Sequence, residues 1–393
     1  MKQLLILGGG TAGTMVANKL RKRLGLDEWA ITVVDQDRTH HYQPGYLLMP
    51  FGTYQPGDIV KPREKLLHGG IDFKVRTVDR VEPAENRVLF AGGEATDYDQ
   101  LVIATGTTPR PDQTPGMPGD EWRKSVHEFY TYEGSKALAA KLEDWTGGRL
   151  VVHITDMPIK CPVAPLEFAF LAEEFFRKKG IRDKVDITYV TPLDGAFTKP
   201  VAARKFGGML EKRGIRLEPD FAIERVDNEA KAIVSYDERE VPFDLLVTVP
   251  LNMGADYIAR SGLGDDLNYV PVDKHTSQSR AWPNIFALGD AGDLPTSKAG
   301  STAHFSVDVF ADNFVRHAQG LPMKERFDGH ANCFLEAGDG KAVLLDFNYE
   351  TEPLPGKFPL DHVGPLNLLR ETRRNHWGKL AFKWIYWHLL LPG

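Results

Sequence analysis

Short apolar runs alternate with longer amphipathic stretches along most of the chain. The runs are rich in valine, isoleucine and leucine and are bounded by polar residues or glycine, so they predict buried strands. The clearest runs are residues 3–7, 30–34, 149–154 and 185–190. The stretches that follow the first and third runs, through residue 24 and over residues 166–179, have helical spacing. Strands that alternate with helices predict an α/β protein built on parallel sheets.

Composition narrows the class of protein without identifying it. The 393 residues are 42% hydrophobic and 26% charged, which is ordinary for a soluble globular protein of two or three domains. A formal net charge of −6 gives no reason to expect nucleic acid as a partner. Two cysteines, no visible secretory leader and no long apolar run lead us to expect a cytosol-facing protein that does not span a membrane. No zinc-like spacing of cysteine and histidine is present, so we expect no metal site.

The first strand leads into a glycine-rich turn with the G-x-G-x-x-G spacing of a dinucleotide-binding site. Gly8, Gly10 and Gly13 allow the tight turn, the approach of a pyrophosphate and close packing of the helix on the strand, with Ala12 between them. The helix N-terminus stabilises the phosphates, and Asp35 at the end of the next strand is placed to accept hydrogen bonds from ribose hydroxyls. The complete order of strand, helix, strand and acid makes a simple glycine turn a poor alternative.

Two later apolar strands, residues 99–103 and 284–288, each end in a short turn. The turn residues of interest are Thr105, Gly106, Gly289 and Asp290. With these turns the sequence resembles the flavoproteins with two dinucleotide-binding domains, of the glutathione-reductase-like fold. The resemblance implies FAD as the cofactor, with the first glycine turn and the Ala-Thr-Gly turn around its pyrophosphate and Asp290 on its ribityl chain. A plain helix cap is the alternative role for Asp290.

The second strand–helix–strand unit, residues 149–190, has a different turn. Where a dinucleotide-binding turn has glycines, this one has Pro158, Pro162 and Pro165. Proline offers no N–H group and keeps the backbone away from a phosphate. The sequence therefore argues against a pyridine nucleotide as the electron donor, and a different compound has to reduce the flavin.

A cysteine stands in this proline-rich turn. Cys161 precedes the predicted helix and follows Lys160, and both a helix N-terminus and a neighbouring cation favour the reactive thiolate. A small buried core cysteine is the alternative. Glu167, further along the helix, either takes part in proton transfer or complements the helix dipole. The other cysteine, Cys333, precedes an apolar strand at residues 342–347, and sequence distance alone does not pair the two thiols.

The segments around both cysteines resemble sulfide:quinone oxidoreductases, and most of all the branch that includes the mitochondrial enzymes. The resembling segments are residues 42–45, 159–165, 294–298 and 327–333, and the likeness runs over nearly the whole chain. The resemblance implies that Cys161 and Cys333 form a redox-active pair beside FAD, and that Lys298 belongs to the cofactor site. In the family, sulfide attacks this pair, one sulfur becomes a persulfide, and two electrons pass through FAD to quinone.

The chain also departs from that family. Many bacterial members have a third cysteine near the position of His127, and some have a histidine within the stretch that corresponds to residues 191–200, but this chain has neither. These differences leave the sulfur acceptor and the exact sulfur substrate open.

The C-terminal segment, residues 370–391, is rich in arginine, lysine, tryptophan and leucine. Its apolar part is too short to span a bilayer and suits a helix at the surface of an anionic membrane. A tail helix packed on the body or on a second subunit is the alternative. The family resemblance favours the membrane, because quinone is reached from the bilayer, and makes Phe334, Phe358 and Trp377 candidate quinone contacts. We expect a peripheral protein on the cytoplasmic face of the membrane.

The predicted architecture is an α/β fold with two Rossmann-like domains of the glutathione-reductase-like flavoprotein type and a C-terminal membrane-associating region. We expect the FAD domain at residues 1–115 and 250–325, and the second domain, which binds no nucleotide and carries Cys161, at residues 116–249. The quinone and membrane region follows at residues 326–393.

The favoured function is FAD-dependent oxidation of sulfide, or of a related small sulfur species, to sulfane sulfur with reduction of membrane quinone. One alternative is a type II NADH:quinone dehydrogenase, which the absent second glycine turn disfavours. Others are a soluble sulfide dehydrogenase that reduces a cytochrome, and a flavin-bearing sulfur carrier or redox sensor. The quinone type, covalent or non-covalent FAD and the oligomeric state, a homo-oligomer included, remain open.

Overall fold

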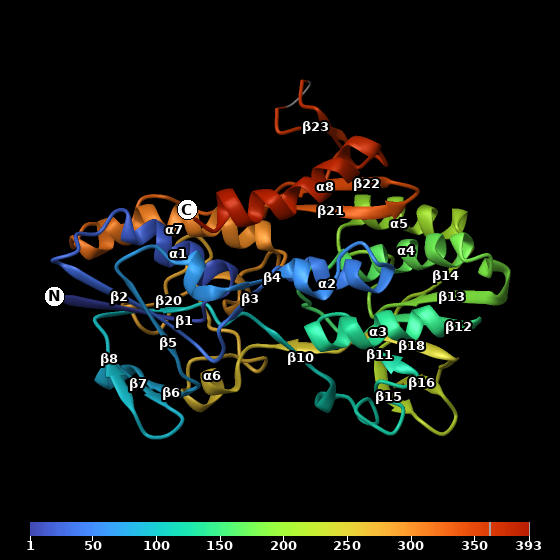
Figure 1. Ribbon diagram of the computed structural model, residues 1–393, viewed down its shortest axis with the longest axis horizontal. Coiled ribbons are helices and arrows are strands. Elements are labelled where there is room, and N and C mark those ends of the chain that lie inside the picture. The colour runs from blue at the N-terminus through green and yellow to red at the C-terminus, as the bar shows by residue number, and fades with distance from the viewer. Residues whose placement is uncertain (361–362, 393) are drawn as a thin grey trace.

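Two parallel sheets lie side by side under a layer of helices and C-terminal strands (Figure 1). The computed structural model describes residues 1–360 and 363–392. The alternation of strands and helices that the sequence predicts is confirmed as an α/β fold. One continuous core of buried side chains joins the first sheet, the helix after Cys161 and the C-terminal segment, so these parts are fixed relative to one another by packing.

The first sheet is formed by the N-terminal part of the chain with one late strand added at its edge. Its order is β20 (Ile285–Ala287), β9 (Gln100–Ile103), β1 (Lys2–Leu7), β2 (Trp29–Asp35) and β5 (Ile71–Val75), all parallel. Helix α1 (Thr11–Arg21) connects β1 to β2 and packs beside α7 (Gly300–Ala318). The strands at residues 3–7 and 30–34 are confirmed to within one residue. Helix α1 ends at Arg21, where the chain turns, instead of continuing to residue 24.

The second sheet repeats this arrangement with different chain segments. Its order is β11 (Val126–His127), β18 (Leu245–Val249), β12 (Gly148–Ile154), β13 (Val185–Val190) and β14 (Ile215–Glu218), also parallel. Helix α4 (Ala164–Lys178) connects β12 to β13, and α5 (Pro200–Lys212) connects β13 to β14. Helix α3 (Tyr132–Asp144) precedes β12. The chain crosses between the two sheets at the antiparallel pair β10 (Thr108–Arg110) and β19 (Leu251–Met253).

Smaller antiparallel elements complete the two sheet units. They are β3 (Thr39–His41) with β4 (Val60–Pro62), β6 (Val78–Glu82) with β7 (Arg87–Phe90) and β8 (Ala95–Asp97), and β15 (Ile223–Asp227) with β16 (Ala232–Ser235) and β17 (Glu240–Pro242). The short helices α2 (Gly45–Leu48) and α6 (Asp256–Arg260) lie in the connections.

The C-terminal region folds back over both sheet units (Figure 1). The hairpin β21 (Ala331–Gly338) and β22 (Lys341–Phe347) packs on α4 and α7, with β23 (Gly356–Phe358) and β24 (Leu366–Leu368) extending its sheet. Helix α8 (Arg373–Ile385) packs on β22 and continues into a wider helical turn, Tyr386–Leu390. No helix within residues 1–360 and 363–392 is long and apolar enough to cross a membrane.

The tail helix is partly packed on the body and partly exposed. Tyr386 and Trp387 are buried against the first sheet unit, whereas Trp377, Trp384 and Leu389 are more than half exposed. The alternative of a tail helix packed on the body therefore applies to the C-terminal end of the tail. The exposed tryptophans leave an apolar surface on the other side.

Candidate active site

A cavity of about 650 Å³ lies between the carboxyl end of the first sheet, the start of α4, β21 and α8. It brings together residues from the whole length of the chain. The sequence-predicted residues that line it are Gly8, Gly10, Ala12, Asp35, Thr105, Gly106, Cys161, Glu167, Gly289, Asp290, Lys298, Cys333 and Phe334. Gly13, Phe358 and Trp377 do not line it.

The glycine-rich turn forms one wall of the cavity. A side chain at Gly13 would overlap the Gly8 carbonyl, and Gly8, in the left-handed region at φ 97°, leaves no room beside the Ala104 carbonyl. Space beside Gly10 is open. The turn therefore packs closely on the sheet while its outer edge stays accessible, as a bound pyrophosphate requires. The cavity is also large enough for a cofactor-sized ligand, so these residues fit FAD.

Asp35 is held in place at the end of this wall. Its Oδ2 accepts a hydrogen bond from the Gly9 N–H at 2.7 Å and forms an ion pair with Arg63. Arg63 is 5% exposed and lines the same cavity. Arg63 could not be recognised from the sequence, because a lone arginine in a long connection has no local signature.

Lys298 connects the flavin-type turn at Asp290 to the cysteine turn. Its ammonium donates to the carbonyls of Asp290 and Gly292, both at 2.9 Å, and lies 3.6 Å from the centre of the Tyr269 ring. Burial lowers the pKa of Lys298 to about 8. Its own carbonyl accepts a hydrogen bond from the Cys161 N–H at 2.7 Å. Lys298 thus fixes the distance between the cofactor site and Cys161.

Cys161 occupies a constrained position immediately before α4. Its φ of 51° is in the left-handed region, which a residue with a side chain adopts at a cost. Its carbonyl accepts from the Ala164 N–H at 2.9 Å and from the Tyr130 hydroxyl at 3.3 Å. The surrounding hydrogen bonds therefore hold the thiol at the edge of the cavity.

Cys333 reaches the same cavity from β21. It is 7% exposed, and both thiols are free. Burial raises the pKa of the Cys333 thiol, and the charge of Cys161 raises it further. Chain segments far apart in the sequence therefore bring both cysteines to the cavity that contains the glycine-rich wall.

The electrostatics of Cys161 differ from the sequence-based expectation. Burial, followed by the charge of Glu167, raises the pKa of the Cys161 thiol to about 12, although the Lys379 ammonium lowers it in part. Lys160 does not supply the dominant cation, because its ammonium donates to Gln43 Oε1 at 3.1 Å. The prediction of a thiolate favoured by the helix N-terminus and Lys160 is therefore wrong for this structure, since burial outweighs both effects.

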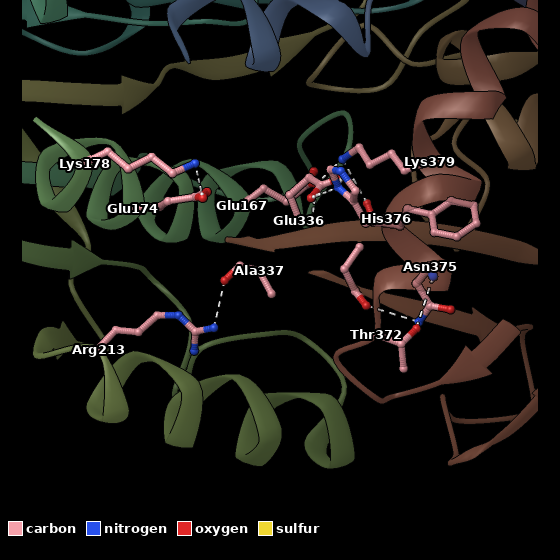
Figure 2. A network of polar contacts seen from close by, with 12 residues as sticks. Glu167, Glu174, Lys178, Arg213, Glu336, Ala337, Thr372, Asn375, His376 and Lys379 are labelled. Atoms are coloured by element: carbon pink, nitrogen blue, oxygen red, sulfur yellow. Dashed lines mark hydrogen bonds and ion pairs between the residues drawn. The ribbon is translucent and has the colours of Figure 1, made fainter. Parts of the chain in front are cut away.

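Glu167 lies inside the cavity wall with two partners from the C-terminal region (Figure 2). Its side chain is 1% exposed, and its Oε1 accepts from the Lys379 ammonium and from the Glu336 N–H at 2.6 Å. Lys379 also donates to the Phe334 carbonyl at 3.2 Å. Burial raises the pKa of Glu167 to about 7 against the opposing effect of Lys379. Glu167 can therefore exchange a proton near neutral pH.

The aromatic candidates are placed differently from one another. Phe334 lines the cavity beside Cys333, while Trp377 is 67% exposed on α8 and Phe358 lies in the outer strand β23. Phe382 and Tyr386 of the tail line the cavity instead. Both were visible in the sequence only as part of the aromatic tail.

The chain is similar to known flavoproteins over most of its length. The family model described as pyridine nucleotide-disulphide oxidoreductase matches residues 2–307, and members of this family are FAD-binding flavoproteins. The mitochondrial sulfide:quinone oxidoreductase of Dictyostelium discoideum is 27% identical over all of this chain and 86% of its own length, and that of Mus musculus is 24% identical with the same coverage.

A solved structure and a more distant enzyme class also match. The sulfide:quinone oxidoreductase structure from Aquifex aeolicus has a TM-score of 0.83 at 21% identity, covering 98% of this chain and 91% of that one. A type II NADH:quinone oxidoreductase of Staphylococcus epidermidis is 28% identical over only 39% of this chain and 34% of its own length. The match to the sulfide:quinone oxidoreductases extends through the C-terminal region. The match to the type II NADH:quinone oxidoreductase covers less than half of this chain.

Proposed function

The chain belongs to the pyridine nucleotide-disulphide oxidoreductase family and is a flavoenzyme oxidoreductase, and from this premise we propose that it oxidises sulfide with Cys161 and Cys333 and reduces quinone. One observation carries the proposal: both cysteines of the chain line the cavity that contains the FAD-type glycine wall. The relatives that match over the full chain are named for the same reaction.

The proposed chemistry begins with the oxidised cysteine pair. Hydrogen sulfide attacks one sulfur, so that the bond between the cysteines breaks and a new sulfur–sulfur bond forms, giving one persulfide, one thiolate and one proton. A thiolate acceptor then takes the outer sulfur, which leaves two cysteine thiolates. Re-formation of the bond between them releases two electrons. For an acceptor thiol RSH, the sum is hydrogen sulfide, RSH and quinone giving RSSH and quinol.

The residues of the cavity have separate tasks in this scheme. FAD, when bound, accepts the two electrons from the cysteines and delivers them to quinone. Gly8, Gly10 and Asp35 would hold its pyrophosphate and ribose, and Lys298 would hold the flavin end near Cys161. Glu167 takes the proton that hydrogen sulfide releases, because it lines the same cavity as Cys161 and burial raises its pKa to about 7. Lys379 stabilises the negative charge left on Cys161.

The alternative donor is NADH. Three features support sulfide over it: the prolines of the Cys161 turn, the two cysteines in the cavity and the partial coverage of the type II NADH:quinone oxidoreductase match. The exposed tryptophans of the tail support quinone from a membrane as the acceptor, with the protein bound peripherally. The cytoplasmic face is part of the proposal and rests on the sequence alone.

Substitution of either cysteine tests the proposal. Cys161→Ser and Cys333→Ser should each lower the rate of anaerobic flavin reduction by sulfide at least about 100-fold, because no disulfide remains to be attacked. Each variant should still contain FAD and show a normal visible spectrum, which serves as the control for folding. Flavin reduction at the wild-type rate in either variant would contradict the disulfide mechanism. Loss of persulfide formation with unchanged reduction by NADH would indicate the NADH-dependent alternative.

A further inference from the structure

A polar cluster joins helix α4, strand β21 and helix α8 (Figure 2). It comprises Glu167 on α4, Glu336 on β21, and His376 and Lys379 on α8. Glu167 lines the cavity, while His376 is at the opposite end with a side chain 24% exposed. The proposed chemistry uses Glu167 and Lys379 and gives no task to Glu336 or His376.

Glu336 is the connecting member of this cluster. Its side chain is 4% exposed, and its backbone N–H donates to Glu167. Both of its carboxylate oxygens lie within hydrogen-bond distance of His376 Nδ1, at 3.0 and 2.9 Å. Lys379 pairs with Glu167 and is also attracted by the charge of Glu336. A buried carboxylate costs free energy unless it is paired. The Glu336 carboxylate is buried between Lys379 on the interior side and His376 on the surface side.

The four side chains of the cluster can hold one extra proton in two places with the same net charge. With Glu336 ionised and Lys379 charged, one further proton can be on Glu167 with a neutral His376. Alternatively it can be on His376 with an ionised Glu167. The net charge of the cluster is the same in both placements, so moving the proton adds no charge to the low-dielectric interior. The proton can therefore move between the cavity and the surface without the cost of burying an unpaired charge.

We propose that Glu336 and His376 form a proton relay that exchanges the proton of Glu167 with solvent once in each turnover. The proposal rests on the proposed function, in which hydrogen sulfide releases a proton to Glu167. Lys379 takes that proton as it gives one of its own to Glu336. Glu336 then gives a proton to His376 Nδ1, and His376 releases its Nε2 proton to water. Exchange of the remaining ring proton with solvent returns His376 to the tautomer with its proton on Nε2. No electron moves in this step, and each group returns to its starting state. The raised pKa of Glu167, about 7, agrees with this role.

Other titratable groups that face the cluster do not compete for the proton. Burial raises the pKa values of Tyr42, Tyr54 and Tyr130, so these groups stay protonated at neutral pH. The two cysteines carry no thiol proton while they form the disulfide that sulfide attacks. Lys383 lies over the Tyr54 ring at 4.1 Å, and Arg213 donates to the Ala337 carbonyl at 2.8 Å and pairs with Glu371. Asp58 acts on Tyr54, and Asp346 acts on Cys333 and binds His330.

The relay predicts that His376 affects repeated turnover more than the first reaction. At about pH 8, above the pKa of Glu167, the base is already ionised, so His376→Ala should reduce its flavin with sulfide within about twofold of the wild-type rate. Steady-state reduction of quinone should fall at least about tenfold, because the proton leaves slowly. Added imidazole should restore the rate, since it can carry the proton through the space that the side chain vacates.

Three further variants separate a relay from a structural role. His376→Gln retains a donor for Glu336 but cannot transfer a proton, so it should be as slow as His376→Ala. Glu336→Gln should also be slow, and imidazole should not rescue it. His388→Ala removes an exposed histidine from the same segment and should keep wild-type turnover without any effect of imidazole.

The outcomes distinguish the relay from the proposed function. Wild-type turnover in His376→Gln, or a slow His376→Ala that imidazole does not restore, would overturn the relay alone. Failure of sulfide to reduce the flavin of the wild-type protein would overturn the proposed function and the relay with it.

Discussion

At the scale of single residues, the reactivity of the cavity depends on burial more than on neighbouring charges. Burial raises the pKa values of Cys161 and Glu167 together, so the thiol and the acid are both neutral over a wider pH range than in water. Lys379 acts in the opposite direction on both groups. When hydrogen sulfide opens the disulfide, the released thiolate forms next to the Lys379 ammonium, which stabilises it. Electron release is therefore favoured only after sulfide has reacted.

The ionisation of Glu167 predicts a specific pH dependence. Because its raised pKa is about 7, the base form is lost as the pH falls through this value, and flavin reduction by sulfide should slow on the acid side. Glu167→Gln should lower the rate at alkaline pH at least about tenfold and should remove this part of the profile. Stopped-flow reduction over a range of pH values measures both effects.

A matched variant on the same helix controls this measurement. Glu174→Gln removes a mostly buried acid of α4 that pairs with Lys178 and does not line the cavity. It should retain the wild-type profile. Hydrogen sulfide itself ionises near neutral pH, so only the difference between the variants reports on Glu167. Identical profiles for Glu167→Gln and the wild type would exclude Glu167 as the base.

At the scale of elements, the start of α8 determines where the polar cluster lies. The Thr372 hydroxyl accepts from the Asn375 N–H at 3.1 Å as a helix N-cap, and the backbones of Thr372 and Ala342 pair with each other. Asn375 is fully buried and donates to the carbonyls of Ala342, Asn367 and Arg370. One helical turn later, Lys379 points to Glu167 on the same side of the helix.

Asn375 should therefore support both stability and the site. Asn375→Ala leaves buried carbonyls without a partner and should lower the free energy of unfolding by about 1–3 kcal/mol. It should also slow flavin reduction, because Lys379 loses its fixed position. Thermal unfolding of the FAD-loaded protein and stopped-flow reduction measure the two effects. Arg374→Ala, at the exposed neighbouring position, should change neither, and equal behaviour of the two variants would contradict the anchoring role of Asn375.

At the scale of the whole molecule, the tail connects the outer surface to the cofactor wall. The Tyr386 hydroxyl donates to His40 Nε2 at 2.6 Å and accepts from the Thr11 hydroxyl at 2.7 Å, while His40 Nδ1 donates to the Gly9 carbonyl. Burial lowers the pKa of His40 to about 3, which keeps it neutral for this arrangement. Asn18 of α1 also donates to the Leu391 carbonyl at 2.7 Å. The end of the tail is therefore joined to the glycine-rich wall of the cavity by a chain of hydrogen bonds.

The exposed face of the tail should bind membranes. Trp377 and Trp384 are 67% and 59% exposed and two helical turns apart, and Lys383 and Arg374 lie in the same helix. The double substitution Trp377→Glu and Trp384→Glu should weaken sedimentation with vesicles containing phosphatidylglycerol roughly tenfold or more. Flavin reduction by sulfide in solution should stay unchanged. Tyr236→Glu, at an exposed site of the second sheet unit, is the control, and equal vesicle binding by both proteins would contradict a membrane-binding tail.

Features built from residues close together in the sequence could be predicted, whereas contacts between distant residues could not. Gly8, Gly10 and Asp35 belong to one continuous strand–helix–strand unit, so their position at a strand end follows from their spacing. The hydrogen bond between Glu167 and Lys379 joins residues 212 positions apart, and no local pattern contains that information. Lys379 and His376 belong to a tail whose charges predict a surface helix, and only the packing of α8 on β22 buries them.

Two other features depended on tertiary structure in the same way. The alternation of polar and apolar residues in β21 is interrupted by Phe334, which stands on the same face as Asn332 and Glu336 and lines the cavity, so the pattern does not indicate a strand. Cys161 is half-buried, and the desolvation that raises the pKa of its thiol cannot be deduced from its neighbours in sequence.

Anaerobic titration of the purified protein, followed through its flavin spectrum, tests the central claim most directly. Sulfide should bleach the flavin, decylubiquinone should then restore its absorbance, and NADH should cause no bleaching. Bleaching by NADH together with an unchanged spectrum after sulfide would contradict it.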